Sequence, residues 1–215
     1  MRSIIFPLIS KKFLSSQLRQ PSGLFGKTMM ADFFNEHNEK MNHFAIERLD
    51  LQPIDKVLDI GFGGGAMIGE MLKIIDTGKI YGVDFSDVMV KQAKQKFEGS
   101  IASGKVSIEF ADVKQLPFDD NIFDKICTVN TIYFWEDPLV GLREIRRVMK
   151  SGGRLVIGIR SADKMKDFPV TQYNFRLYEP EAIKDLLIGA GFSSILIEHR
   201  DQDERLDSVM ITAYA

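Results

Sequence analysis

The segment VLDIGFGGGA, residues 57–66, places an apolar run, one carboxylate and four glycines at the junction between a predicted strand and a predicted helix. Glycine lets the chain turn sharply and lets a ligand approach the backbone without a Cβ in the way. The spacing Gly-x-Gly-x-x-Ala from Gly61 onward also satisfies the dinucleotide-binding pattern, in which a helix N-terminus faces a pyrophosphate. The segment therefore predicts a small-molecule site after the first strand and leaves the molecule open.

From residue 55 onward, short runs of β-branched residues alternate with helix-length segments, which is typical of a mainly parallel sheet with helices on both faces. Strands are predicted at KVLDI, KIYGVD, KVSIEF, DKICTVN, GRLVIGI, SSILIEH and SVMITAY. The last two are joined by a polar segment too short for a crossover helix, so we expect them to pair as a hairpin. The predicted fold class is α/β, a Rossmann-like seven-stranded sheet with one antiparallel edge strand and an N-terminal helical extension.

Two segments fall outside this alternation, residues 1–50 and the stretch SADKMKDFPVTQYNFRLY, and both are rich in Met, Phe and Tyr. Ligands of open α/β sheets bind beyond the carboxyl ends of the strands, where added segments can roof the crevice. We therefore divide the chain into an N-terminal arm with lid helices, residues 1–50, and a sheet domain, residues 51–215. Residues 1–31 are basic, rich in serine and free of acidic residues, so an organelle-targeting segment is the alternative to an amphipathic arm interrupted by Pro7.

Composition excludes several classes of protein. A chain of 215 residues with 45% hydrophobic residues can bury one substantial core, and its net charge of -2 gives no basic field for nucleic acid. No apolar run is long enough to cross a bilayer. The lone Cys127 can form no internal disulfide and lacks partners for a metal site. We expect a cytoplasmic protein with no membrane span and no metal.

Carboxylates follow three successive predicted strands. Asp59 ends the first strand, Asp84 ends the second, and Asp112 follows the third, just before Leu-Pro-Phe. A carboxylate at Asp84 can accept hydrogen bonds from both hydroxyls of a ribose, and Asp112 lies where an adenine ring would be. Since Asp59 would repel a pyrophosphate, the three acids together favour an adenosine with a cationic, amino-acid-like tail.

Five segments resemble the class I S-adenosylmethionine-dependent methyltransferases, in order and in spacing, over about residues 50–213: VLDIGFGGG, IYGVDFS, FADVKQLPF, FDKICTVNTIYFW and LREIRRVMKSGGRLVI. The similarity is closest to the small-molecule branch typified by the quinone-biosynthesis methyltransferases. It implies that residues 51–215 form a class I methyltransferase domain. It also implies an enzyme that moves the sulfonium methyl of S-adenosylmethionine to an O, C or N nucleophile of a small molecule by in-line displacement.

The resemblance also implies residue roles. Asp59 and the glycines lie near the methionine part of the cofactor, Asp84 at the ribose hydroxyls, and Asp112 with Val113 at the adenine. Three residues after the fourth strand are expected to contact the substrate: Tyr133, Phe134 and Trp135. The expected cofactor-binding residues are Asp59, Gly61, Phe62, Gly63, Gly65, Asp84, Phe85, Asp112, Val113 and Asn130.

No strong catalytic signature is present, and none is required, because the sulfonium methyl is already activated and positioning can supply most of the rate enhancement. The candidates for a general base are Tyr133 and His43, with His37 as a further histidine of the lid segment. Many small-molecule relatives carry a histidine after the fourth strand, where this chain has Phe134 and Trp135. Five residues look like core or lid material, which as a lid would favour a flat or apolar acceptor: Met29, Met30, Phe33, Phe34 and Met41.

Three alternatives remain open from the sequence. A nicotinamide-dependent oxidoreductase is disfavoured by Asp59 and by the lack of a Tyr-x-x-x-Lys pair. A non-catalytic nucleoside-binding module would keep the same acidic residues, and a protein or RNA methyltransferase would need a charged groove that composition does not reveal. The arm packs either on its own domain or on a second chain, and the latter would give a homodimer.

Overall fold

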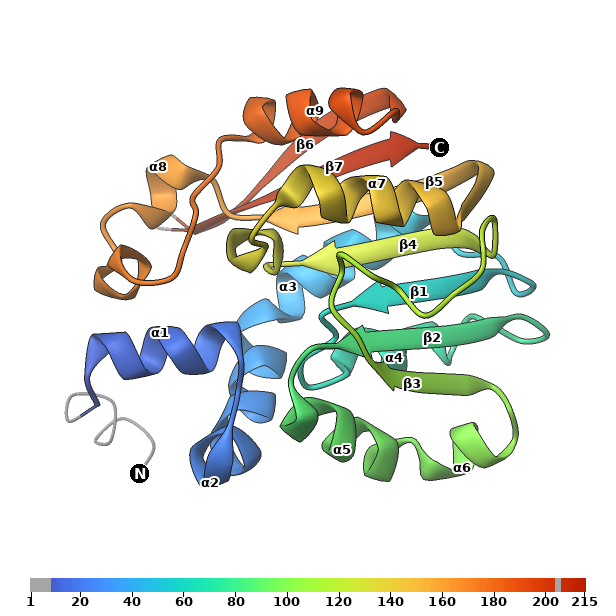
Figure 1. The fold of residues 1–215 in the computed structure, drawn as a ribbon, viewed down its shortest axis with the longest axis horizontal. Coiled ribbons are helices and arrows are strands. Elements are labelled where there is room, and N and C mark those ends of the chain that lie inside the picture. The colour runs from blue at the N-terminus through green and yellow to red at the C-terminus, as the bar shows by residue number, and fades with distance from the viewer. Residues whose placement is uncertain (1–8, 204–205) are drawn as a thin grey trace.

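The computed structural model describes residues 9–203 and 206–215, so the first eight residues, Pro7 among them, lie outside the description. It shows a seven-stranded sheet with helices on both faces (Figure 1), in the order β3-β2-β1-β4-β5-β7-β6. The predicted fold class is confirmed. The strands are β1 Lys56–Ile60, β2 Lys79–Asp84, β3 Val106–Phe110, β4 Phe123–Val129, β5 Met149–Ile159, β6 Ser193–Asp203 and β7 Leu206–Tyr214.

The strand order determines where a ligand can enter. The strands β1, β2 and β3 run side by side and parallel, and β4 and β5 continue in parallel on the other side of β1. The chain therefore reverses its direction of winding between β1 and β4, and a crevice opens at the carboxyl ends of strands at such a point. Asp59 near the end of β1 and Asn130 just after β4 flank this position.

The C-terminal hairpin is present, with β6 and β7 antiparallel. The strand β7 also pairs antiparallel with β5, so the antiparallel strand lies one position inside the edge and β6 forms the edge itself. The last strand, β7, lies between β5 and β6. Its residues Val209, Met210 and Ile211 are therefore buried.

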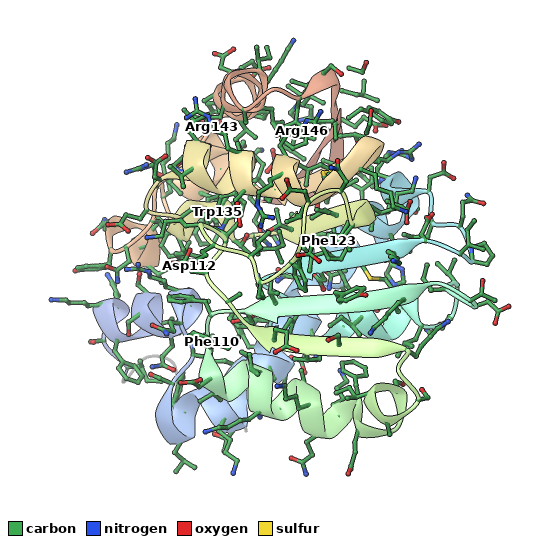
Figure 2. All side chains as sticks on the ribbon, turned by 45° about the vertical axis from the view of Figure 1, so that its right-hand side comes forward. Phe110, Asp112, Phe123, Trp135, Arg143 and Arg146 are labelled. Carbon is green, nitrogen blue, oxygen red and sulfur yellow. The ribbon has the colours of Figure 1, made fainter. Side chains whose placement is uncertain are left out.

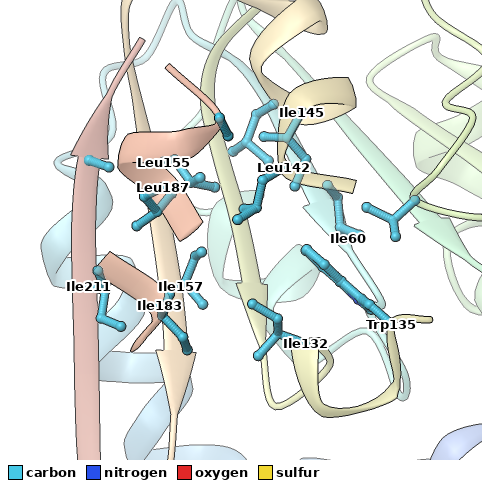
Figure 3. Packing of buried hydrophobic residues seen from close by; sticks show 14 of the residues in the cluster. Ile60, Ile132, Trp135, Leu142, Ile145, Leu155, Ile157, Ile183, Leu187 and Ile211 are labelled. Atoms are coloured by element: carbon cyan, nitrogen blue, oxygen red, sulfur yellow. The ribbon is translucent and has the colours of Figure 1, made fainter. Parts of the chain in front are cut away.

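Alternate residues of the strands supply two cores, one on each face of the sheet. Val57 and Leu58 are adjacent in β1, yet Leu58 packs with the helices α7 and α9 and Val57 packs with α3, α4 and α5. Figure 3 shows the first core, where Leu142 and Ile145 of α7 meet Ile183 and Leu187 of α9 above the strands. These helices span α3 Ala31–Leu49, α4 Ala66–Met71, α5 Asp87–Lys96, α7 Pro138–Val148 and α9 Pro180–Gly189.

The helix α7 illustrates how local sequence sets an element. The Asp137 Oδ1 accepts a hydrogen bond from the Leu139 backbone N–H at 3.0 Å, and Pro138 occupies the first turn, where its missing N–H costs nothing. The remaining short helical segments are α2 Gly23–Phe25, η3 Gly26–Met30, α6 Glu98–Ala102, η4 Ile132–Phe134, α8 Ala162–Met165 and η5 Pro169–Gln172.

The N-terminal extension is helical, as predicted, and its described part packs on its own domain. The helix α1, Lys11–Arg19, is held by loops of the sheet domain at its middle and at its C-cap: Ser15 Oγ donates to the Tyr173 carbonyl, and Gln20 Nε2 donates to the Phe85 carbonyl at 2.9 Å. Ser86 Oγ adds a hydrogen bond to the Pro21 carbonyl at 2.6 Å. Within residues 9–203 and 206–215, none of the helices combines the length and the apolar character needed to span a membrane.

Candidate active site

A cavity lies at the carboxyl ends of the parallel strands, under α1 and the first half of α3. It encloses about 1180 Å³ including its open mouth. Most of the residues that the sequence singled out meet there. The cavity is lined by Asp59, Gly61, Phe62, Gly63, Asp84, Phe85, Asp112, Val113, Asn130, Phe134 and Trp135.

The glycine loop after β1 is closely packed on both sides. Gly61 has a φ of 73° and a Cβ there would collide with Thr131 Cγ2, while a Cβ on Gly63, at a φ of 53°, would lie 3.0 Å from the Phe34 ring. Side chains at these positions would therefore be strained and would push neighbouring segments apart. Gly65 does not line the cavity; it precedes α4 at a φ of 69°, with the Phe97 ring where a Cβ would lie.

Asp84 connects the second strand to the glycine loop. Its Oδ2 accepts a hydrogen bond from the Gly63 backbone N–H at 3.0 Å, and its Oδ1 accepts one from the Ser86 N–H at 2.9 Å. Burial raises the pKa of Asp84 to about 6, although these N–H donors act to lower it. The carboxylate is thus fixed in orientation at the cavity wall, as a ribose acceptor requires.

Asp59 is the most unusual polar group in the cavity wall. Its side chain is 2% exposed, its Oδ1 accepts only a weak hydrogen bond from Cys127 Sγ at 3.7 Å, and its Oδ2 has no hydrogen-bond partner in the described part of the chain. Burial raises the pKa of Asp59 to about 7. Because native proteins rarely leave a buried carboxylate oxygen unpaired, the Oδ2 indicates a missing donor or cation from a ligand.

The opposite end of the cavity carries exposed ion pairs. Asp112 Oδ1 accepts a hydrogen bond from the Lys114 backbone N–H at 2.9 Å, and Lys114 Nζ lies 2.7 Å from Glu136 Oε2. Figure 2 shows Asp112 and Trp135 on the loops at this edge of the sheet, above Phe110 at the end of β3. Val113 and Trp135 add apolar surface, so this end offers both an acceptor and the apolar contacts that an adenine ring needs.

Tyr133 corrects one prediction from the sequence. It is 3% exposed and does not line the cavity, so it is placed neither as a base nor as a substrate contact. Its hydroxyl accepts a hydrogen bond from the Arg160 backbone N–H and lies 3.3 Å from Asn130 Oδ1, and burial raises its pKa further above the ordinary value. Tyr133 supports Asn130 from behind, whereas Phe134 and Trp135 face the cavity.

The other base candidates are not brought to the cavity. His43 is exposed on α3 and is not among the lining residues. The side chain of His37 lies outside the described residues. Met30 and Met41 are fully buried in the core beneath α3, so they do not supply the apolar lid surface that the sequence suggested.

Several lining residues escaped the sequence analysis. One signal was present: Asn35, Asn38 and Asn42 recur at a spacing of three and four, which places them on one face of a helix. The arm residues Leu18, Arg19 and Pro21 gave no such signal, because a local sequence does not show where an arm will dock. In the described chain, no group of three or more His, Cys, Asp and Glu side chains is arranged to hold a metal ion.

Comparison with known proteins relates this chain to methyltransferases. The family described as a methyltransferase domain matches residues 58–157. The chain is 35% identical over 115 residues to the ubiquinone/menaquinone biosynthesis C-methyltransferase UbiE of Geotalea daltonii, an alignment that covers 53% of this chain and 49% of that protein. A crystal structure of a SAM-dependent methyltransferase from Aquifex aeolicus superposes with a TM-score of 0.70 at 20% identity, covering 86% of this chain and 97% of that one.

A further relative is an uncharacterized 37.1 kDa protein of a transposon from Streptomyces fradiae, 35% identical over 158 residues. That alignment covers 71% of this chain and 45% of the relative. The chain thus spans about half the length of these two curated relatives.

Proposed function

Because this chain belongs to the class I S-adenosylmethionine-dependent methyltransferases, we propose that it transfers a methyl group from S-adenosylmethionine to an O, C or N nucleophile of a small molecule. The observation that carries this proposal is the unpartnered, buried Asp59 Oδ2 in the same cavity as Asp84 and the glycine loop. The α-ammonium group of the cofactor supplies the cation that this oxygen lacks. A pyrophosphate would place a second negative charge there.

We propose roles for the lining residues that follow from their positions. Asp84 accepts from the ribose hydroxyls, Asp112 with Val113 holds the adenine, and Asp59 binds the amino-acid end. The other proposed cofactor contacts are Gly61, Phe62, Gly63, Gly65, Phe85 and Asn130, of which Gly65 acts only by shaping the loop. Residues 51–215 form the methyltransferase domain in this proposal, and residues 1–50 cover it.

When bound, S-adenosylmethionine supplies a methyl group that its sulfonium already activates. The chain has to orient a nucleophile toward that methyl and keep water out, and positioning of this kind supplies on the order of 7–11 kcal/mol. Phe134 and Trp135 line the wall beside Asn130, while α1 and α3 cover the mouth. With Tyr133 buried behind Asn130 and His43 outside the cavity, we assign no general base among these candidates.

We further propose that the acceptor is a small molecule and not a nucleic acid, since the net charge of -2 gives no overall basic field and the arm covers the cavity. A cytoplasmic location is proposed as well, and the single buried, free Cys127 is compatible with a reducing compartment. Association of two chains through the N-terminal arm stays a prediction.

Thermal unfolding tests the proposed cofactor. S-adenosylhomocysteine at roughly 100 times its Kd should stabilise the protein by about 2.7 kcal/mol, which for this chain length corresponds to a rise in Tm of roughly 5–10 °C. NADH at the same concentration is the control and should leave Tm unchanged. A shift with NADH and none with S-adenosylhomocysteine would defeat the proposal. Transfer of a labelled methyl group to a panel of quinols, phenols, amines and fatty acids would then identify the acceptor.

A further inference from the structure

The helix α3 has two chemically distinct faces. Met41 and Phe44 lie on its buried face and pack against the sheet. Asn35, Asn38 and Asn42 lie on the face that lines the cavity, and we call these three residues the amide face. Among the described side chains of α3, Phe34 is the remaining one in the lining, and no carboxylate, cation or aliphatic side chain accompanies the amides there.

The amide face lies over the glycine loop. A Cβ on Gly64 would collide with the Ala31 carbonyl oxygen and with Asn35, so the start of α3 touches the backbone of the loop. One turn further along the helix, Asn38 reaches Asn130 at the end of β4. The amide face therefore borders the part of the cavity that also holds Asp59, at the end assigned above to the methionine part of the cofactor.

Hydrogen bonding fixes which atoms the amides offer to a ligand. Asn130 Nδ2 donates to Asn38 Oδ1 at 2.9 Å and lies 3.4 Å from Met41 Sδ, which can only accept, while the Tyr133 hydroxyl faces Asn130 Oδ1. Asn38 thus uses its acceptor within the protein and keeps its N–H donors. The side chains of Asn35 and Asn42 have no hydrogen bond to any described residue. The amide face therefore offers side-chain N–H donors at the cavity wall, and at Asn38 the carbonyl oxygen is already used within the protein.

Among the described residues, no cation lines the cavity beside Asp59. Among the described residues that line it, the basic ones are Arg19 and Lys114, and both lie at the rim near Glu136, which Lys114 contacts at 2.7 Å. Lys96 Nζ donates to the Gly64 carbonyl at 2.9 Å and lines an adjoining hollow, which shares Asn35, Gly63 and Gly64 with the cavity, but Lys96 does not line the cavity itself. Within the described lining, an anionic group near Asp59 therefore faces neutral donors.

We propose that the amide face binds the α-carboxylate of the cofactor through its side-chain N–H groups, while Asp59 binds the α-ammonium. This inference rests on the proposed function. Hydrogen bonds from neutral donors to a carboxylate are stronger than those between neutral groups. With both ends of the amino-acid tail bound in this way, the amide face determines specificity. It selects nucleosides with a complete amino-acid tail over 5'-methylthioadenosine, which has the same adenosine but lacks the tail.

The test compares the affinities of two nucleosides, S-adenosylhomocysteine and 5'-methylthioadenosine. Trp135 is the single tryptophan of the chain and lines the cavity, so its fluorescence reports binding without turnover. Asn38→Asp keeps an oxygen that can accept from Asn130 Nδ2 but places a negative charge against the α-carboxylate. This variant should raise the Kd of S-adenosylhomocysteine by about 10- to 100-fold and change the Kd of 5'-methylthioadenosine by less than about twofold. Asn42→Asp, at a side chain without a hydrogen bond to any described residue, should do the same.

Lys40→Gln is the matched control, because it changes the net charge by the same one unit on the exposed side of α3. It should leave both affinities unchanged, and the Tm of each variant verifies folding. The inference is overturned if a variant binds both nucleosides more weakly by the same factor, or if its Kd for S-adenosylhomocysteine is unchanged. In the second case, a raised KM for a methyl acceptor would assign the amides to the acceptor instead. If the unsubstituted chain binds neither nucleoside, the proposed function itself fails.

Discussion

Replacing Asp84 with alanine weakens the binding of S-adenosylhomocysteine by about 3 kcal/mol, or roughly 100-fold in Kd. Two causes act together. The substitution removes the acceptor proposed for the ribose hydroxyls, and it releases the Gly63 and Ser86 N–H groups that the carboxylate holds at 3.0 and 2.9 Å. Isothermal titration calorimetry measures the loss directly.

Two further variants separate these causes. Asp84→Asn keeps one acceptor oxygen but loses the charge, so its Kd should fall between those of the unsubstituted protein and the alanine variant. Asp87→Asn removes an exposed carboxylate three residues further along that does not line the cavity, and it should bind normally. An alanine variant of Asp84 with unchanged affinity would rule out its role at the ribose.

The second large effect concerns the stability of the ligand-free protein and its dependence on pH. Burial raises the pKa of Asp59 from 3.8 to about 7, so between these values the folded state retains a proton that the unfolded state has released. When folding raises the pKa of a group, its full contribution to the free energy of unfolding is present below the pKa of the unfolded state. That contribution is lost as the pH rises through the pKa of the folded state. The free energy of unfolding should therefore fall between about pH 4 and 7, by on the order of 4 kcal/mol from this group.

Asp59→Asn isolates that contribution, because the amide resembles the protonated carboxyl in shape and does not titrate. The variant and the unsubstituted protein should have similar stability near pH 4 in urea unfolding, and the variant should be more stable at pH 8. Burial also raises the pKa of Asp84, to about 6, and Asp84 is present in both proteins. Part of the fall in the free energy of unfolding should therefore remain in the variant. If the free energies of unfolding of the two proteins change in parallel between pH 4 and 8, the raised pKa assigned to the buried Asp59 carboxyl is contradicted.

The sequence was sufficient for the strands and for the three acids, and the reason is geometric. Parallel strands bring their carboxyl ends to one edge, so residues that end successive strands, Asp59 and Asp84, must lie near each other, and Asp112 follows the third strand to the same edge. Short runs of β-branched residues between helix-length segments indicate the strands that carry them.

The parts that sequence reasoning missed depend on tertiary packing. Tyr133 was expected in the cavity, but it lies in the 3-10 turn Ile132–Phe134, where successive residues point about 120° apart, so only one of the three faces the cavity. The Met and Phe residues of α3 suggested an apolar lid. The orientation of that helix buries Met41 and turns the amide face to the cavity, together with Phe34.

The most direct test is a crystal structure of the protein with S-adenosylhomocysteine. We expect the ribose hydroxyls on the Asp84 carboxylate, the adenine beside Asp112 and Val113, and the α-ammonium on Asp59 Oδ2. A nucleoside bound outside this cavity, or an Asp112 side chain that points away from the purine, would contradict the account.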